Sequence, residues 1–360
     1  MCKRILVSPT NTEDGVPFYK IGTIGSTPDA YISKELFDDY KVKYNYPRKG
    51  EVMITCAGTV GKCVVYDGED AYFQDSNIVW IDNPTQYISN GFLFHLLSKV
   101  DWRKLNSTTI IRIYNDDLRN LKMSYPRKEE QQKISHLLSL LDERIATQNK
   151  IIEKLQSLIK GLVDELMTVL LKGKLYPFSS FYIKAGEGGT PTTSVVEYYT
   201  EGTIPFIKIE DLSCKYLTNN KDFITELGMQ KSSAWLIPSK SVIYSNGATI
   251  GAISINEYPV CTKQGILGIV PNTNINVEYL YLLMSSSYFS KEISRIITEG
   301  TMKTAYLKDI NHIKCPLPSM AQQKNITNLT SSIEEKLSIE QELLRFLNLQ
   351  KQYLLHMMFI

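Results

Sequence analysis

The chain of 360 residues repeats itself at an offset of about 190 residues, and this duplication constrains the fold more than any other feature. Segments of the first half recur in the second half in the same order. The matched pairs are 17–21 with 205–209, 52–61 with 242–251, 114–126 with 306–318, and 130–134 with 322–326. The offset drifts by only a few residues, as loop insertions would produce, so the sequence predicts two copies of one fold.

Each copy has two parts of different character. The first parts, residues 1–126 and 177–318, are rich in Tyr, Ile, Val and Thr in short runs broken by Gly, Pro and Asn, which is typical of short strands and turns. Short helices are predicted at 91–99 and 277–297. The second parts, residues 127–176 and 319–360, read as long helices. The predicted fold class is therefore α+β, with two pseudo-symmetric domains of mixed strands and short helices separated by two long helices.

The long helical segments carry heptad patterns, with apolar residues at alternating steps of four and three. Only Gln148 interrupts the first seam, and Glu340 holds the equivalent position in the weaker second seam. Pairing the helices antiparallel, as a coiled coil, is the simplest way to bury both seams, and the two polar residues would then share a register-setting layer. The seam residues are Leu138, Leu141, Ile145, Gln148, Ile152, Leu155, Ile159, Leu162, Leu166 and Val169, followed by Ile326, Thr330, Ile333, Leu337, Glu340, Leu344, Leu347, Lys351, Leu354 and Met358.

The ends of the long helices are marked in the sequence. Ser319 and Gln322 have the spacing of a capping box, and Glu129-Glu130 suits the positive end of a helix dipole. Lys172-Gly173 followed by Pro177 is a stop signal. The first helix is thus predicted over 128–172, a length of roughly 65 Å at 1.5 Å per residue.

Composition narrows the possible functions. Lys plus Arg is 40 against 38 for Asp plus Glu, so the net charge of +2 argues against a protein that coats DNA without sequence preference. The six cysteines include no Cys-x-x-Cys pair and no neighbouring His, which argues against a zinc site or a disulfide framework and suits a reducing cytoplasm. No signal peptide and no run near the roughly 20 apolar residues of a membrane span is visible.

The order of the parts resembles the specificity subunit of type I restriction-modification systems. Tyr125-Pro126 and Pro316-Leu317-Pro318 each close a globular part just before a helix that begins Glu/Gln-Gln-x-x-Ile, at 130–134 and 322–326. Gly188-Gly189-Thr190-Pro191 resembles the Gly-rich opening of that family's recognition domain, and 166–175 and 353–359 resemble its helix ends. The resemblance covers nearly the whole chain.

The resemblance implies a function. Two target recognition domains, 1–126 and 177–318, would each read half of a bipartite site in double-stranded DNA, and the conserved helical spacers, 127–176 and 319–360, would dock two methyltransferase subunits. Those partners would methylate adenine with S-adenosylmethionine, and restriction/translocase subunits would join, so this chain itself would hold no cofactor and no catalytic residue. A spacer of the predicted length would suit half-sites one to two turns apart, since equivalent groove faces recur about every 34–36 Å.

The first domain departs from the pattern. Only 14 residues precede Gly15, whereas about 25 lie between Pro177 and Gly202, and no Gly-Gly-Thr-Pro precedes Gly15. The first domain is therefore expected to lack its N-terminal strand.

Candidate DNA contacts fall into two groups. Polar residues that recur in both copies are expected to position phosphates, because two half-sites usually differ in base sequence. These are the pairs Lys20 and Lys208, Thr59 and Thr249, and Gln74 and Gln264. Base-reading residues should lie where the copies differ, and the candidates are Lys62, Arg112, Lys263 and Lys303. For Lys20 and Lys208 a solvated strand end is an equal alternative.

Other motifs point to chemistry only weakly. Gly58-Thr59-Val60-Gly61-Lys62 lacks the first glycine and final Ser or Thr of a phosphate loop, so a strand-turn is favoured. Pro28-Asp29 with 39–41 loosely fits a metal-dependent nuclease, but the second copy lacks it. The four histidines are scattered singly: His95, His136, His312 and His356.

The helices and the repeat also admit other readings. Apolar residues off the first seam predict a second buried face where a partner could dock, although an intramolecular helix pair without a partner would also fit. These residues are Leu137, Leu140, Leu158 and Met167. A scaffold that binds other proteins is the main alternative function, and an enzyme with an unrecognised site comes third.

Overall fold

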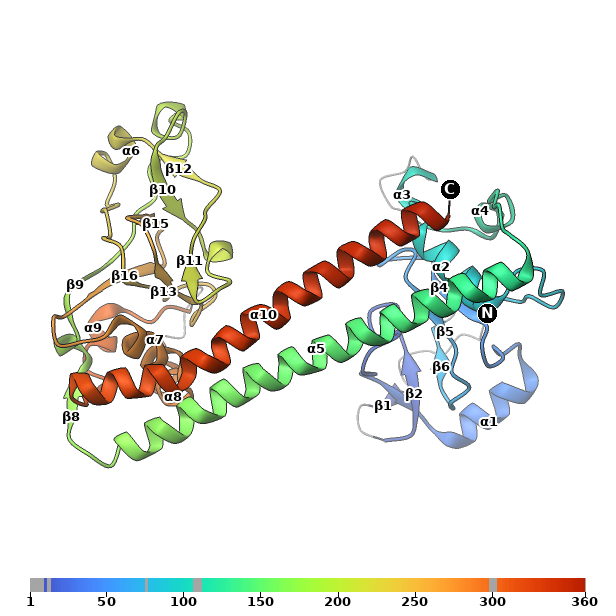
Figure 1. Ribbon diagram of the computed structural model, residues 1–360, viewed down its shortest axis with the longest axis horizontal. Helices are drawn as coiled ribbons and strands as arrows, with labels where there is room; N and C mark the ends of the chain where they lie inside the picture. The colour runs from blue at the N-terminus through green and yellow to red at the C-terminus, as the bar shows by residue number, and fades with distance from the viewer. Residues whose placement is uncertain (1–9, 12–13, 75–76, 106–111, 298–302, 360) are drawn as a thin grey trace. The chain divides into compact units, whose positions relative to one another are not determined.

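The computed structural model describes residues 10–11, 14–74, 77–105, 112–297 and 303–359. The chain divides into two compact units, residues 1–149 with 342–360 and residues 150–341. Each unit holds one globular domain and a portion of both long helices, α5 (Lys128–Leu170) and α10 (Met320–Met358), drawn in green and red in Figure 1. The prediction of a helix over 128–172 agrees with α5 to within two residues.

In the first unit the two long helices run antiparallel. Leu138 of α5 is buried in a cluster that includes Leu354 and Phe359, and one turn further along α5 Asp142 forms an ion pair with Lys351 at 2.5 Å. Gln148, at the polar position of the seam, is 5% exposed. In the second unit Glu340 is likewise buried and pairs with Lys336.

The predicted seam of α5 fails near its C-terminal end. Val169 is 62% exposed, whereas Val163 and Met167 are buried in the core of the second domain. The last turns of α5 thus follow a spacing of four residues, which presents a different face, because they pack on a globular domain there. The prediction that Met167 lies on an outer face for a partner is wrong, but Leu137, Leu140 and Leu158 are exposed as expected.

The second domain is built on a five-stranded sheet of order β11-β14-β13-β16-β9. Its central strand, Val242–Ser245, pairs on both sides with antiparallel neighbours. It is buried at every position because both faces of the sheet are covered: Val242 and Tyr244 enter one hydrophobic cluster and Ile243 enters another. A three-stranded sheet of order β12-β10-β15 and the pair β17-β8 complete the domain. The strands are β8 (Leu175–Pro177), β9 (Tyr182–Glu187), β10 (Ile204–Ile207), β11 (Tyr216–Leu217), β12 (Phe223–Ile224), β13 (Val242–Ser245), β14 (Ile253–Asn256), β15 (Cys261–Thr262), β16 (Ile266–Pro271) and β17 (Lys314–Pro316).

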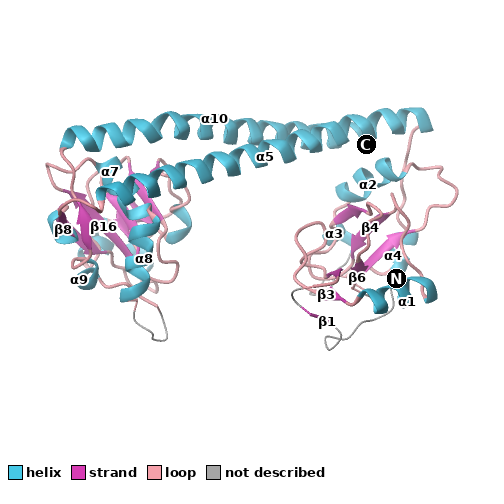
Figure 2. Ribbon diagram, turned by 90° about the horizontal axis from the view of Figure 1, so that it is seen from below, coloured by secondary structure: helices cyan, strands magenta, loops and turns pink. Residues whose placement is uncertain are grey.

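Helices cover one face of this sheet. In the second unit α7 packs between the sheet and the long helices, as Figure 2 shows. The helices are α6 (Glu226–Gln230), α7 (Val277–Ser285), α8 (Ser287–Ile296) and α9 (Leu307–Ile310), with 3-10 turns at Phe178–Ser180, Val196–Tyr198 and Ile209–Asp211. The prediction of one helix over 277–297 is wrong. Ser286 is extended, ends α7, and caps α8 by accepting a hydrogen bond from the Phe289 amide.

The first domain repeats a reduced version of this plan. Its sheets have the orders β5-β4-β7 and β1-β3-β2-β6, and α2 packs on β4 and β5 as α7 packs on β13 and β14. The elements are β1 (Thr10–Asn11), β2 (Val16–Tyr19), β3 (Tyr31–Ile32), α1 (Lys34–Lys43), β4 (Val52–Thr55), β5 (Cys63–Val65), β6 (Tyr72–Phe73), β7 (Ile78–Ile81), α2 (Asn90–Lys99), α3 (Trp102–Leu105) and α4 (Asn115–Arg119). The described part of this domain has no strand beside β7 in the place that β9 takes beside β16. The expected loss of an N-terminal strand concerns residues 1–9, which lie outside the described residues.

One turn shows the duplication at the level of single bonds. Between β4 and β5 the Gly61 amide donates to Thr55 O at 2.9 Å, and between β13 and β14 the Gly251 amide donates to Ser245 O at 3.0 Å. Both glycines have positive φ angles, +84° and +102°, which side chains disfavour. Residues 58–62 are therefore a turn between antiparallel strands, as predicted, because a strand rather than a phosphate-binding helix follows them.

A buried glutamine joins each domain to the start of its long helix. Gln131 accepts a hydrogen bond from the Ser89 amide and donates to Tyr87 O and Pro126 O. Gln323 makes the same set of bonds in the second copy, with the Asn276 amide, Asn274 O and Pro318 O. Ser89 and Asn276 are the N-caps of α2 and α7. The Glu/Gln-Gln-x-x-Ile motif is thus a latch that fixes the domain to the helix.

Candidate nucleic-acid interface

In the second domain, loops distant in the sequence meet at one end of the sheets. The Asn246 amide donates to Gly265 O at 3.0 Å, the Ala305 amide donates to Asn246 O at 2.9 Å, and the Gln264 amide donates to Thr190 Oγ1 at 3.4 Å. The candidates Thr249, Lys263, Gln264 and Lys303 lie in these loops and are exposed. Lys208 belongs to the same group, since its neighbour Ile207 accepts a hydrogen bond from the Lys263 amide.

The first domain gathers the equivalent loops with equivalent bonds. The Cys56 amide donates to Asn77 O at 2.7 Å, and the Ile113 amide donates to Cys56 O at 2.9 Å. The Gln74 amide donates to Tyr19 O, next to Lys20. The candidates of this domain are therefore also neighbours: Lys20, Thr59, Lys62, Gln74 and Arg112.

The recurring lysines sit at matching strand ends and are ion-paired in both copies. Lys20 Nζ lies 3.1 Å from Asp29, and Lys208 Nζ lies 2.8 Å from Asp222. The hydrogen bond to Asp222 raises the pKa of Lys208 above its usual value. Both lysines are half-exposed, which fits either a solvated strand end or a phosphate contact. Each lysine already has an acidic partner within its own domain.

Strand register corrects one of the predicted equivalences. Phe18 is paired with Tyr72, and its counterpart Phe206 is paired with Cys261, in parallel ladders. The residue after each second strand is then Gln74 in the first domain and Lys263 in the second, and their amides donate to Tyr19 O and Ile207 O at the same 2.9 Å. The match of Gln74 with Gln264 is wrong, because the first-domain turn is one residue longer and shifts the apparent alignment.

The remaining candidates differ in how firmly they are held. Lys62 donates from its ammonium group to Ile24 O, which ties two loops of the first domain together. Arg112 is half-buried, with its guanidinium 5.9 Å from the ring centroid of Tyr114. Arg112 lies near Cys56, and burial raises the pKa of the Cys56 thiol to about 11. Thr59 and Lys303 are exposed.

Glycines allow the Gly-rich segment to enter this group of loops. A Cβ atom on Gly188 would lie 2.1 Å from Thr262 O, and one on Gly189 would lie 2.5 Å from the Ala234 amide nitrogen. Neither position can carry a side chain unless the backbone moves. The sequence revealed this motif, but not the close backbone approach that requires it.

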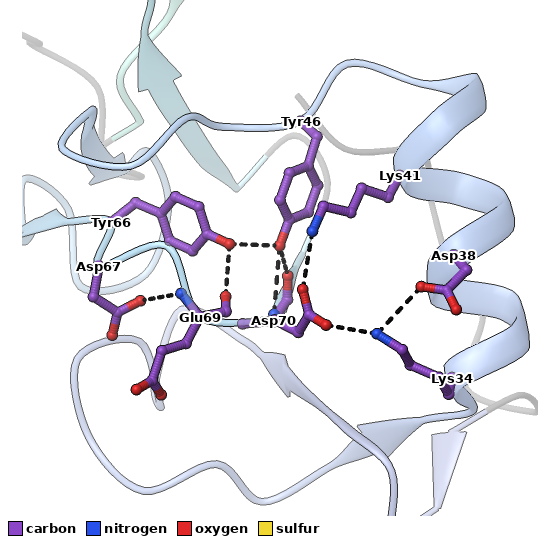
Figure 3. A network of polar contacts seen from close by, with 9 residues as sticks. Lys34, Asp38, Lys41, Tyr46, Tyr66, Asp67, Glu69 and Asp70 are labelled. Atoms are coloured by element: carbon purple, nitrogen blue, oxygen red, sulfur yellow. Dashed lines mark hydrogen bonds and ion pairs between the residues drawn. The ribbon is translucent and has the colours of Figure 1, made fainter.

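Two charged groups were missed because they have no counterpart in the other copy. In the first domain Lys34 and Lys41, both on α1, pair with Asp70 at 2.5 and 2.9 Å, and Lys34 also reaches Asp38 (Figure 3). The two lysines hold the pKa of Asp70 below its usual value. Beside them the Tyr46 and Tyr66 hydroxyls lie 3.0 Å apart. The seven-residue spacing of Lys34 and Lys41, which places both on one face of α1, was the only signal of this network in the sequence.

In the second unit a largely buried lysine connects the domain to α10. Lys215 pairs with Glu278 of α7 at 2.5 Å and with Glu334 of α10 at 2.6 Å, and its side chain is 15% exposed. Burial acts to lower the pKa of Lys215, but the hydrogen bonds to both carboxylates outweigh it and raise that pKa. Asp164 of α5 completes the connection by accepting hydrogen bonds from the Ser287 amide and hydroxyl at the start of α8.

The weak motifs do not assemble into a catalytic or metal site in the described part of the chain. Asp29 is paired with Lys20, and Asp39 is paired with Lys43. Among the described residues no three His, Cys, Asp or Glu side chains are grouped as a metal ion would need. His95 is buried, and burial lowers its pKa. No described helix combines the length and apolar character that a bilayer-spanning segment needs.

The family model described as "Type I restriction modification DNA specificity domain" matches this chain twice, over residues 1–157 and 181–348. The chain belongs to this family. The double match agrees with the internal repeat.

Named relatives belong to the same family. A putative type I restriction enzyme specificity subunit of Haemophilus influenzae is 49% identical over 155 residues, which are 43% of this chain and 40% of that protein. The putative MjaX specificity subunit of Methanocaldococcus jannaschii is 24% identical over 307 residues, 79% of this chain and 70% of that protein. The match thus spans less than half the length of the H. influenzae relative.

Solved structures of the type I family share the fold. The S subunit of a type I restriction-modification system from M. genitalium superposes with a TM-score of 0.57 at 17% identity and covers 100% of this chain and 92% of that one. A structure from a study of type I complex assembly and conformational transition gives a TM-score of 0.55 at 16% identity, over 96% and 91% of the two chains. These likenesses confirm the predicted α+β class with long helices.

Proposed function

We propose that this chain is the DNA specificity subunit of a type I restriction-modification complex and reads a bipartite site, one half with each domain. The domains are residues 1–126 and 177–318. The chain would direct partner methyltransferase subunits to adenines, and partner restriction subunits to unmodified DNA, in the cytoplasm, without catalysis of its own.

One observation carries this proposal. The two domains gather the same loops through the same main-chain hydrogen bonds, yet several side chains on those loops differ between the copies. A constant frame with differing side chains is what two readers of unlike half-sites require, because main-chain placement is shared while base recognition is not. A scaffold protein would have no need for this pattern.

The helical spacers, residues 127–176 and 319–360, are proposed as the docking site of two methyltransferase subunits. Large apolar side chains off the seam are exposed on both helices, which is costly in water unless a partner covers them. They are Leu137, Leu140, Ile151 and Leu158 on α5, and Leu329, Ile339, Phe346, Leu349, Tyr353 and Met357 on α10.

The test is to co-express the chain with the methyltransferase subunit of its own system and to map modified adenines across a genome. We expect modification at one motif made of two short sequences and an unread spacer. Exchanging residues 177–318 for the corresponding domain of a relative should change one half of the motif only. Absence of modification together with DNA binding that ignores sequence would refute the proposal and favour a scaffold.

A further inference from the structure

Gln74 in the first domain and Lys263 in the second occupy equivalent positions at the end of a strand. Their main-chain hydrogen bonds are the same, but their side chains differ in chemistry. Each amide donates to the carbonyl before the recurring lysine, Tyr19 O or Ile207 O, at 2.9 Å. Lys20 and Lys208 beside them are both ion-paired with an aspartate. The recurring lysine is therefore part of the frame, and the neighbouring position is where the copies diverge.

The side chain of Gln74 is used within the first domain. Its Oε1 atom accepts a hydrogen bond from the Ile21 amide at 3.3 Å, which helps to hold the turn that follows Lys20. The residue is half-buried. This glutamine therefore acts as a support for the neighbouring turn.

The turn that carries Lys263 is held without any help from its side chain. The amides of three successive residues are bound: Lys263 to Ile207 O at 2.9 Å, Gln264 to Thr190 Oγ1 at 3.4 Å, and Gly265 to Glu187 Oε1 at 2.7 Å. Thr190 and Glu187 come from the segment that has no described counterpart in the first domain. The Lys263 side chain is exposed, and no ion pair of it is found among the described residues. A rigid turn thus presents an ammonium group to solvent.

We infer, on the basis of the proposed function, that Lys263 is a specificity-determining residue of the second domain that donates hydrogen bonds to a guanine in its half-site. Phosphates line both half-sites alike, so a lysine that only binds phosphate is expected to recur at the same position in both copies. Lys263 does not recur. An ammonium group offers donors only, and guanine presents two acceptors, O6 and N7, in the major groove.

Preorganisation supports this assignment. A base contact discriminates only when the side chain starts from a fixed point, because a mobile loop can shift to satisfy the wrong base. The three bound amides and the close approach of Gly247 to Gly265 supply that fixed point. In the first domain the equivalent residue, Gln74, is used in a hydrogen bond within the domain. The first domain would therefore read its half-site with other residues.

The experiment compares genome-wide adenine modification by the complex with the wild-type chain and with the variants Lys263→Gln and Lys263→Arg. We expect Lys263→Gln to reduce the preference for G·C at one base pair of one half-site by roughly 10- to 100-fold, with the other half-site unchanged. Lys263→Arg should keep the preference, because arginine donates to the same acceptors. Lys291→Gln, an exposed lysine on α8, is the matched control and should change nothing.

The outcomes separate the two claims. An unchanged motif with Lys263→Gln, or an equal drop in modification at every site, would overturn the assignment of Lys263 while the bipartite motif of the wild type still supports the proposed function. A wild-type complex with no motif at all would overturn the proposed function, and the assignment with it.

Discussion

The two domains share a frame but differ in how that frame is supported. The second has a five-stranded sheet whose edge strand β9 and following glycines brace the loop end, whereas the described first domain has three strands there. The first domain instead has the longer helix α1 and a surface network around Asp70. The common elements are the parallel strand pair, the central buried strand and the glutamine latch. Both copies thus retain the elements that position the loops, and they differ in the additional elements that stabilise those loops.

The largest effect is expected in the Gly-rich segment after β9, which has no described counterpart in the first domain. Gly188→Ala would place a methyl group 2.1 Å from Thr262 O, and we expect it to lower the free energy of unfolding by about 3 kcal/mol or more. Denaturant unfolding measures the loss, and hydrogen exchange should localise it to the second unit. Gly22→Ala is the control, because nothing lies within 4 Å of the added atom. Equal effects of the two variants would contradict the bracing role.

The glutamine latches should matter equally in both domains. Gln131→Ala and Gln323→Ala each remove three partly buried hydrogen bonds to main-chain groups, so each should cost roughly 2–3 kcal/mol. Hydrogen exchange should show faster opening of α2 in the first variant and of α7 in the second. The neighbouring exposed Gln132→Ala should be neutral. A loss in only one domain would show that the copies are not equivalent at this point.

Only the second domain should depend on a buried lysine. Lys215→Met leaves Glu278 and Glu334 without their cation, and we expect a loss of about 2 kcal/mol. Lys240→Met is the control, since its ion pair with Glu257 has a similar length but its side chain is 60% exposed. If both variants lose the same stability, burial is not what makes the Lys215 pair strong.

The same lysine predicts a pH dependence. Because the folded pKa of Lys215 lies above the usual 10.5, its contribution to stability is complete below that value and is lost as the pH rises through the folded pKa. Wild-type stability in the second unit should therefore fall in the alkaline range, and Lys215→Met should flatten that part of the curve. Unfolding measured between neutral and strongly alkaline pH tests this, and parallel curves would contradict it.

The smallest effect is expected at the surface network of the first domain. Asp70→Asn removes the shared partner of Lys34 and Lys41, but these groups are exposed, so solvent screening limits the loss to at most about 1 kcal/mol. The pKa of Asp70 is lowered, so its contribution is present above the usual 3.8 and is lost as the pH falls through the folded pKa. High salt should erase the difference between wild type and variant.

The two domains and the two long helices could be predicted because the internal repeat and the heptad periodicity are visible in the sequence itself. The heptad spacing predicted the long helices, and the recurrence of 52–61 at 242–251 predicted a strand and a glycine turn in both domains, which are β4 and β13 with the turns that follow them. The errors arose where tertiary contacts decide. Ser286 splits a run that looks like one helix, and Met167 turns inward because a domain packs against the end of α5.

Recurrence, charge and loop position were enough to choose candidate residues from the sequence, but not to show that they are neighbours. Main-chain hydrogen bonds between distant loops bring them together within each domain, and only strand register distinguishes Gln74 as the counterpart of Lys263. The contacts of Lys62 with Ile24 and of Lys215 with Glu334 join residues far apart in the sequence, and no local pattern announces them. The roles of the candidate loop residues as DNA contacts stay predictions.

The partners of each glutamine latch all come from its own copy: Tyr87, Ser89 and Pro126 for Gln131, and Asn274, Asn276 and Pro318 for Gln323. A genetic crossover within the helical segment downstream of either glutamine would therefore transplant a whole domain with its attachment intact. The latch that attaches each domain to its long helix would therefore also allow recombination to replace one domain without disturbing the other.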